Sequence, residues 1–131
     1  MEMKNAVALK RRKRPTYRES DIQKHFFQWL RFAYPDIWRI SFAIPNGGYN
    51  LSYAMQQKLK NEGRKAGVLD VFIPVGTSSY HGLFIEFKSQ GKKPTPEQKE
   101  MMTLWTERGY HCVVCYSWEE SSESLKRYLN V

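Results

Sequence analysis

The sequence lacks any run of apolar residues long enough to cross a membrane. A spanning helix needs roughly 20 mostly apolar residues, and no stretch of the 131-residue chain approaches that length. The first residues, Met1-Glu2-Met3-Lys4, also lack the apolar core of a secretory signal peptide. We therefore expect one domain with a single core, in the cytoplasm and with no membrane partner.

Cysteine is scarce, with only Cys112 and Cys115 in the chain. The second pair that would complete a zinc site is missing. A redox pair usually opens a helix, whereas these two residues lie in an apolar run typical of a strand. Their odd spacing directs the thiols to opposite faces of a strand. We therefore predict core cysteines in a reducing compartment.

Acidic residues are outnumbered, since 13 Asp and Glu face 21 Lys and Arg and leave a net charge of +8. Such an excess favours a polyanionic partner. Residues 1–15 hold six basic residues and one acidic residue, which leaves +5 on this segment. We predict a flexible basic arm at 1–15 and a folded domain at 16–131. Arg11 and Arg12 are phosphate-binding candidates, and a merely solvated arm is the alternative.

Apolar spacing and turn residues predict helices and strands in alternation. We expect a first helix that begins at a capping box of either Thr16 with Glu19 or Ser20 with Gln23 and ends at Tyr34-Pro35. Further helices are expected at 52–62, 96–108 and 118–128, and strands at 37–44, 67–74, 82–88 and 110–116. This order predicts an α/β fold with a mixed central sheet flanked by helices.

Charged residues interrupt the two middle strands of this predicted sheet. Asp70 lies at the start of one, and Glu86 and Lys88 lie two residues apart in the other, so both point to one face. Burying such groups is costly unless they are paired or bind a metal. The trio suits metal-assisted phosphodiester hydrolysis, in which carboxylates hold Mg²⁺. The alternative is an ion pair of Glu86 and Lys88 on an exposed strand.

Other polar residues have both a functional and a structural interpretation. Glu19 either caps the first helix or presents an acid to the sheet. Gln98 follows Thr95 and Pro96 at the spacing of a capping box, which is a complete structural role. The remaining candidates are basic or turn residues that either bind nucleic acid or are solvated, namely Asn46, Arg64, Lys65, Lys92 and Lys93.

This set of residues resembles the PD-(D/E)xK nuclease superfamily and, within it, the VRR-NUC family. Asp70 matches the aspartate of the family's Gly-x-Pro-Asp element, although Leu69 stands where the family prefers proline. Glu86-Phe87-Lys88 matches its E-x-K element. The turn that contains Asn46, the helix-opening Gln98 and the early helical acid Glu19 also match, so the resemblance spans about residues 16–120.

The resemblance implies a restriction-endonuclease-like core and a divalent-metal-dependent DNA endonuclease. Asp70, Glu86 and the Phe87 carbonyl would bind Mg²⁺ or Mn²⁺, and Lys88 would position the attacking water. Gln98 would contact that lysine or the substrate backbone, and Glu19 would support a second metal or orient a water. Small free-standing members are typical of phages and prophages, which implies work in a bacterial or phage-infected cell, and similar domains act on branched DNA. No small-molecule cofactor is expected.

The working unit is predicted to be a homodimer that cuts a four-way (Holliday) junction. One chain offers one site, and symmetric cutting of two strands needs two sites, which a two-fold dimer supplies. Aromatic residues make up 15% of the chain, more than a small core needs, and they favour interfaces. The alternatives are a DNA-binding module that does not cut, a monomeric flap, single-strand or RNA nuclease, and a sequence-reading restriction enzyme.

Overall fold

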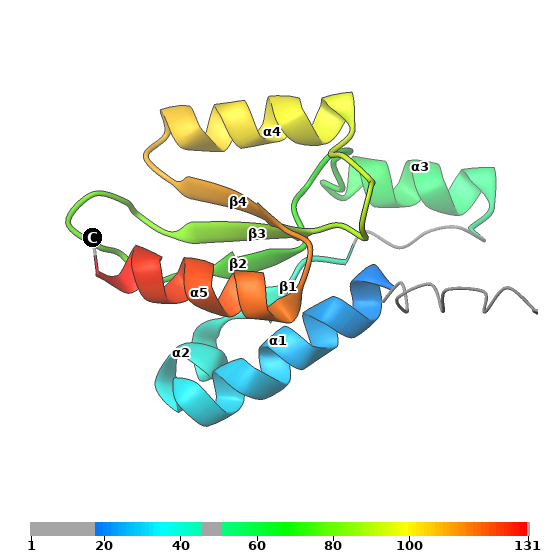
Figure 1. Cartoon of the computed structure of the whole chain (residues 1–131). Coiled ribbons are helices and arrows are strands. Elements are labelled where there is room, and N and C mark those ends of the chain that lie inside the picture. Colours follow the sequence, from blue (N-terminus) through cyan, green and yellow to red (C-terminus); the bar gives the residue numbers. More distant parts are fainter. Residues whose placement is uncertain (1–17, 46–50, 131) are drawn as a thin grey trace, which may run out of the picture.

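The structure is a computed structural model that describes residues 18–45 and 51–130. In these residues the helices and strands follow one another as α1 (Glu19–Ala33), α2 (Pro35–Ile40), β1 (Phe42–Ala43), α3 (Tyr53–Asn61), β2 (Val71–Ile73), β3 (Leu83–Phe87), α4 (Pro96–Glu107), β4 (His111–Cys115) and α5 (Trp118–Leu129). Helix α4 covers one face of the sheet, and α1 and α5 cover the other (Figure 1). The predicted α/β class, with a mixed sheet between helices, is confirmed.

The strands form one mixed sheet in the order β1-β2-β3-β4. β2 is antiparallel to both β1 and β3, whereas β4 runs parallel to β3. A parallel neighbour needs a crossover connection, and α4 supplies it between β3 and β4. Strand β3 is therefore flanked on both edges and is buried along its whole length.

The main core lies between the sheet and the helices α1 and α5. Leu83, Ile85 and Phe87 alternate along β3 and point into it, where they pack with Phe26 of α1 and Leu125 of α5. All five side chains are fully buried, and each contributes roughly 1.5–3 kcal/mol of hydrophobic stabilisation. The even-numbered residues of β3 consequently face α4.

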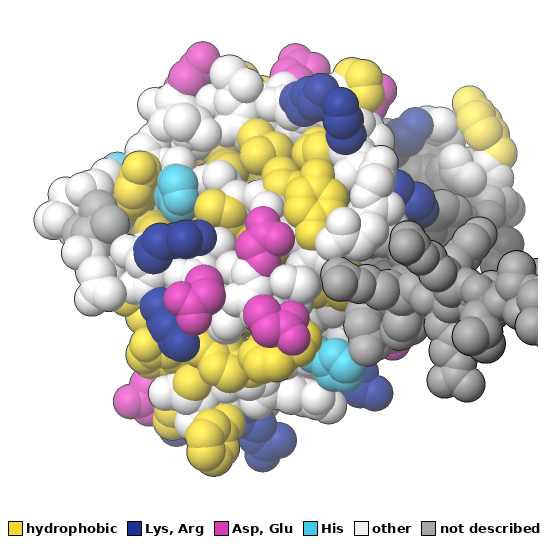
Figure 2. All heavy atoms as spheres, in the orientation of Figure 1, with side chains coloured by type: hydrophobic (Ala, Val, Ile, Leu, Met, Phe, Trp, Pro, Cys, Tyr) yellow, Lys and Arg dark blue, Asp and Glu magenta, His cyan; other side chains and the backbone are white. Residues whose placement is uncertain are grey.

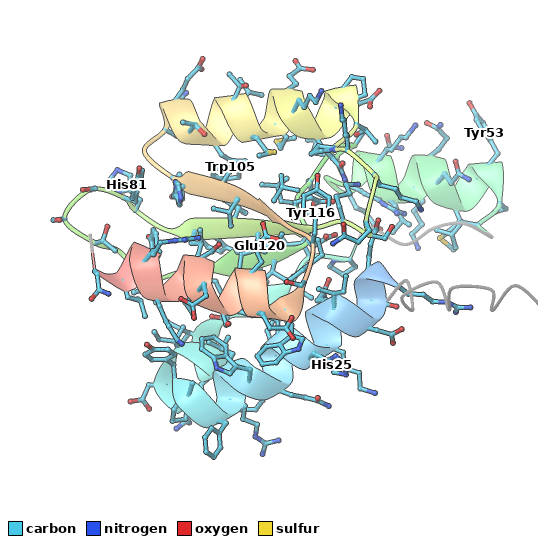
Figure 3. The ribbon with its side chains drawn as sticks, in the orientation of Figure 1. His25, Tyr53, His81, Trp105, Tyr116 and Glu120 are labelled. Atoms are coloured by element: carbon cyan, nitrogen blue, oxygen red, sulfur yellow. The ribbon has the colours of Figure 1, made fainter. Side chains whose placement is uncertain are left out.

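Aromatic rings fill the space between the sheet and α4. Trp105 of α4 lies 4.5 Å from Phe84, centroid to centroid, and Phe84 stacks on Phe72 at 4.6 Å. Trp105 also meets Tyr110 edge to face at 4.9 Å, and Figure 3 shows its ring below the helix. This apolar contact anchors α4 over β3, so the first turn of α4 is held over the end of the strand.

The predicted strand over residues 37–44 is wrong for its first half. Residues 35–40 form α2, which starts with Pro35 at its first position, where the missing N–H costs no hydrogen bond. Ile37 and Trp38 pack against the core from this helix. Of the predicted strand, only Phe42 and Ala43 form strand β1.

The helix starts support some of the predicted caps. Thr95 and Gln98 form the predicted capping box at α4, with Pro96 at the first position. Helix α1 starts instead after Arg18, without a side-chain cap, so the box of Ser20 with Gln23 is wrong. Thr16 lies outside the described residues, as does the predicted arm at 1–15.

The two cysteines are free and lie in β4, as predicted. Cys115 pairs in register with Phe87 and faces the core, whereas Cys112 pairs with Phe84 on the α4 side. Burial raises the pKa of both thiols, that of Cys115 to about 11. Across the described part of the chain, no helix has the length and apolar character to span a membrane.

Candidate active site

A cleft of about 600 Å³ opens where β3 ends beneath the first turn of α4. Its walls come from the start of α1, from one side of α3, from the segment between α3 and β2, and from the loop before α4. The charged residues that line it are Glu19, Lys60, Arg64, Lys65, Asp70, Glu86, Lys88 and Glu97. The predicted trio therefore meets in one concave site, together with the early helical acid.

Glu86 is the most deeply placed charged side chain of the cleft, with 2% of its surface exposed. Its Oε1 accepts a hydrogen bond of 2.7 Å from Gln98 Nε2 and lies 3.5 Å from Lys88 Nζ. Its Oε2 is buried and has no hydrogen-bond partner among the described residues. A buried polar atom without a partner is costly, so this oxygen is a candidate contact for a ligand.

Asp70 is fixed by the backbone of the strand that carries Glu86. It lies just before β2, and its Oδ2 accepts a hydrogen bond of 2.8 Å from the Phe87 N–H. The backbone of the same residue holds the edge strand, because its carbonyl accepts a hydrogen bond from the Ile44 N–H at 2.8 Å. Asp70 is thus tied to both β1 and β3.

The two carboxylates resist ionisation. Burial raises the pKa of Glu86 to about 8; the charge of Asp70 acts in the same direction, and Lys88 opposes it. Burial likewise raises the pKa of Asp70, against the favourable Phe87 hydrogen bond. Desolvation and like charge both disfavour the ionised form, and strongly perturbed carboxylates in a cleft are a feature of functional sites.

Lys88 follows β3 and is also buried, with 8% of its surface exposed. The alternative interpretation of Glu86 and Lys88 as an ion pair on an exposed strand is therefore wrong. The Nζ of Lys88 forms an ion pair with the buried Glu86 carboxylate at 3.5 Å, and its charge opposes the burial that raises the pKa of the half-buried Asp70. The position of its Nζ at the cleft wall suits a group that orients a bound water or phosphate.

Gln98 has the predicted capping role and makes a second contact, with Glu86, that was not predicted. Its Oε1 accepts a hydrogen bond of 2.9 Å from the Thr95 N–H and so completes the capping box. Its Nε2 donates to Glu86, not to Lys88. The N-terminal turn of α4 is thereby connected to the carboxylate, and the amide fixes the rotamer of Glu86.

Glu19 reaches the same cleft from the first turn of α1. Its Oε1 accepts a hydrogen bond of 3.3 Å from the Ser89 N–H, so it contacts the segment after β3 instead of capping its own helix. Its charge helps to raise the pKa of Asp70, which places the two carboxylates within electrostatic reach of each other.

The basic candidates divide into two groups. Arg64 and Lys65 line the cleft, whereas Lys92 and Lys93 lie exposed in the loop before α4 and do not line it. Asn46, Arg11 and Arg12 are outside the described residues.

Sequence reasoning missed the contribution of α3. Gln56 and Lys60 line the cleft, and their spacing of four residues puts both on one side of the helix; Arg64, which also lines the cleft, follows after the helix has ended. That spacing was visible in the sequence, but the sequence did not reveal which side of α3 faces the site. Tyr53, at the start of the helix, is 78% exposed and extends away from the body of the molecule (Figure 3).

Gly67 was also missed as a structural requirement of the site. Its φ of +77° is a conformation that glycine adopts readily. A Cβ at this position would lie 2.4 Å from the carbonyl oxygen of Glu97. The residue therefore lets the segment that carries Asp70 pack directly against the turn that carries Gln98.

The donor set suits a hard divalent cation such as Mg²⁺. This ion is usually held by one or two carboxylates, with waters and substrate phosphates filling its octahedron. Asp70 and Glu86 supply two carboxylates, and the unpartnered Glu86 Oε2 offers a free lone pair. In residues 18–45 and 51–130, no group of three or more His, Cys, Asp and Glu side chains could hold a metal ion, so a second metal at Glu19 gains no support.

Comparison with known proteins identifies a domain family and a similar solved structure. The model of the VRR-NUC domain family matches residues 8–119. A solved structure named "VRR_NUC domain protein" superimposes with a TM-score of 0.76 at 25% sequence identity, over 88% of this chain and 91% of that one. No curated protein matches the chain.

Proposed function

The chain belongs to the VRR-NUC domain family and is thus a nuclease-type protein, and we propose that it is a divalent-metal-dependent DNA endonuclease that hydrolyses phosphodiester bonds. The observation that carries this proposal is the buried Glu86 carboxylate with one oxygen left unpartnered. The cost of keeping that group in the fold is explained if a cation completes its coordination.

Asp70, Glu86 and the backbone carbonyl of Phe87 would hold the cation, Mg²⁺ or Mn²⁺. When bound, it would neutralise charge on the scissile phosphate and lower the pKa of a coordinated water. Gln98 holds Glu86 in position through Oε1, and Oε2, which has no hydrogen-bond partner among the described residues, would contact the cation. The Phe87 N–H holds Asp70 in the same way.

Lys88 would position the attacking water and stabilise the negative charge that develops on the phosphate. Its ammonium group lies 3.5 Å from Glu86 Oε1, and with little solvent around it the charge acts in a low-dielectric setting, where electrostatic stabilisation is strong. Glu19 would orient a further water at the mouth of the cleft.

The substrate we propose is DNA, bound mainly through its backbone. Lys60, Arg64 and Lys65 place positive charge along one wall of the cleft, where phosphates adjacent to the scissile one would pass. Contacts of this kind position a strand without reading its sequence. The arm at 1–15, with Arg11 and Arg12, would add affinity through its net charge of +5.

We further propose a two-fold homodimer that cuts branched DNA, with a four-way junction as the preferred substrate, in the cytoplasm of a bacterial or phage-infected cell. The described residues of each chain form one site with Asp70, Glu86 and Lys88, so paired incisions would need two chains. Figure 2 shows apolar side chains on the surface between charged groups, and side chains of this kind would be available to an interface. Among the described residues, Ile40 of α2 and Leu104 of α4 are exposed apolar side chains, at 51% and 50%, in separate parts of the surface.

A cleavage panel tests these proposals. Single strands, duplexes, flaps and four-way junctions would be incubated with the protein and Mg²⁺, Mn²⁺ or EDTA, and sedimentation would give the oligomeric state. We expect junction cleavage in paired strands, abolished by EDTA, and a species of twice 15.5 kDa. A monomer that nicks flaps and ignores junctions would refute the dimer and favour the flap-nuclease alternative.

A DNA-binding module that does not cut is the competing function. Loss of a ligand is the usual consequence when a site is no longer used, and Asp70, Glu86 and Lys88 are all present and gathered in one cleft. Binding without cleavage of any substrate in the panel, with either metal, would establish that alternative.

A further inference from the structure

Helix α3, beside the candidate active site, carries a large aromatic side chain that is mostly exposed. No residue of the helix is buried. Its apolar contact with the body comes from Leu59, which is half-buried and lines a hollow together with Ile44 and Val68. Tyr53 lies about 120° around the helix axis from Leu59 and is 78% exposed. A single exposed ring needs no explanation by itself, so its position relative to the cleft is decisive.

Tyr53 is in line with two residues that form a wall of the cleft. Gln56 and Lys60 line the cleft, and they follow Tyr53 by three and seven residues, so all three side chains lie along one side of α3. Positions seven residues apart differ by only about 20° around the helix axis. At a rise of about 1.5 Å per residue, Tyr53 lies about 10 Å beyond Lys60, at the end of α3 farther from the sheet (Figure 3).

The wall that leads from the carboxylates toward Tyr53 is positively charged. Within residues 56–68, the side chains that line the cleft include three cations and no acid. The cations are Lys60, Arg64 and Lys65. Helix α3 itself also has no acidic residue. A line of positive charge that leads out of a cleft is suited to a phosphate backbone.

The polar surroundings of Tyr53 disfavour a protein as its partner. Protein interfaces place aromatic residues in centres that are depleted of charge. On the side of α3 that carries Tyr53, the next residues are Gln56, Gln57 and Lys60. A second copy of the chain would bring the cations of one protomer toward those of the other. A nucleic acid offers a base to the ring and phosphates to the cations, which is how proteins hold single strands.

We propose that Tyr53 stacks on an unpaired base of a DNA strand whose phosphates pass Lys60 and enter the cleft. The proposal rests on the nuclease function proposed above, and it adds a specificity-determining residue outside the cleft. With a rise of about 3.4 Å per nucleotide, the stacked base lies about three nucleotides from the phosphate at Lys60. Neighbouring bases cover both faces of a base in a continuous duplex, so the ring favours DNA with an unpaired base at this distance.

The test measures DNA binding by the full chain in EDTA, so that metal-dependent cleavage does not interfere. The probes are a blunt duplex, a duplex with a single-stranded thymidine tail, and tailed duplexes in which one thymidine at a time is abasic. Tyr53→Ala and Tyr53→Gln both remove the ring. Each should weaken binding to the tailed duplex by about tenfold and leave binding to the blunt duplex unchanged. Tyr53→Phe keeps the ring and should retain the wild-type affinity.

The abasic probes locate the stacked base. Wild-type protein should lose about tenfold in affinity at one abasic position of the tail, and Tyr53→Ala should cause no further loss there. Phe32→Ala is the matched control, because Phe32 is an exposed ring, at 92%, that does not line the cleft. This variant should bind the tailed duplex as the wild type does. Melting temperatures should agree among the variants, and Tyr53→Gln replaces Tyr53→Ala if alanine lowers the value.

Three results would overturn the proposal. One is wild-type affinity of the ringless variants for the tailed duplex. Another is an equal loss in Tyr53→Phe and Tyr53→Ala, which would assign the effect to the hydroxyl group. The third is a loss that persists at every abasic position or that accompanies a change in oligomeric state, which would exclude stacking on a base.

Failure of this proposal and failure of the nuclease function give different results. If the wild-type protein cuts DNA and Tyr53→Ala binds the tailed duplex normally, the nuclease function stands and the stacking subsite is absent. If the wild-type protein cuts nothing but Tyr53→Ala loses base-dependent binding, the subsite exists without the nuclease activity.

Discussion

Substituting Gly67 by alanine should destabilise the protein and disturb the candidate active site together. A non-glycine residue in the left-handed region costs about 1–2 kcal/mol, and Gly67 has a φ of +77°. The new Cβ would lie 2.4 Å from the Glu97 oxygen and 2.5 Å from its carbonyl carbon. Overpacking against rigid backbone adds about 1–3 kcal/mol. We therefore expect a loss of about 2–5 kcal/mol in the free energy of unfolding, measured by urea denaturation.

Gly63→Ala is the matched control for this measurement. Gly63 lies in the same segment and has a φ of +106°, but no atom lies within 4 Å of an added Cβ. It should lose only the conformational part, about 1–2 kcal/mol. The difference between the two variants then isolates the contact of Gly67 with α4. Equal losses in both variants would refute the reasoning, because they would mean that the contact carries no energy.

Gly67→Ala and Gly63→Ala should also differ in their rates of cleavage. To relieve the contact, the segment that carries Asp70 must move away from the turn that carries Gln98. Metal and substrate would then be bound in a distorted site, and a displacement near 1 Å lowers rates by about a hundredfold. Single-turnover cleavage by folded Gly67→Ala should therefore fall well below that of Gly63→Ala at equal folded fractions.

Substitutions in the cleft should separate chemistry from DNA binding. Glu86→Gln should lower the rate of cleavage at least about a hundredfold. It should also remove the rise in melting temperature expected on adding Mg²⁺, while DNA binding in EDTA persists. Cleavage at the wild-type rate would exclude Glu86 from the site. Lys60→Gln should reduce the slope of log affinity for DNA against log salt concentration by about one. Lys58→Gln, two residues away on α3 and outside the cleft, should leave that slope unchanged. Equal slopes for the two variants would show that this face of α3 does not contact phosphate. Deletion of residues 1–15 should also flatten the salt dependence with single-turnover cleavage intact at saturating protein, and an unchanged slope would exclude contact between the arm and phosphate.

The features that the sequence predicted correctly are local ones. Glu86 and Lys88 share a face because a strand repeats every two residues, and their burial follows from the apolar neighbours of β3. The capping box at Thr95 and Gln98 depends on four consecutive residues. Patterns of this range are determined by the chain itself, so they could be predicted before the fold was known.

Features that depend on packing could not be predicted in the same way. The α2 segment alternates apolar and polar residues well enough for a strand, but proline at its first position and contacts with α1 make it helical. The hydrogen bond from Gln98 to Glu86 requires α4 to cross over β3, which is fixed by aromatic contacts distant from the site. The face of α3 that meets the cleft is likewise a tertiary property.

The two faces of the sheet account for how one small domain holds both a stable core and a charged site. On the side of α1 and α5, the odd-numbered residues of β3 are apolar and fully buried. On the side of α4, Trp105 of the helix packs on Phe84, and the polar first turn of the helix lies next to Glu86. Because Gln98 and Lys88 satisfy only one oxygen of that carboxylate, the fold carries an electrostatic cost in the absence of a ligand. On the metal-dependent function proposed above, a divalent cation would offset that cost, so metal binding and folding stability should be linked in this protein.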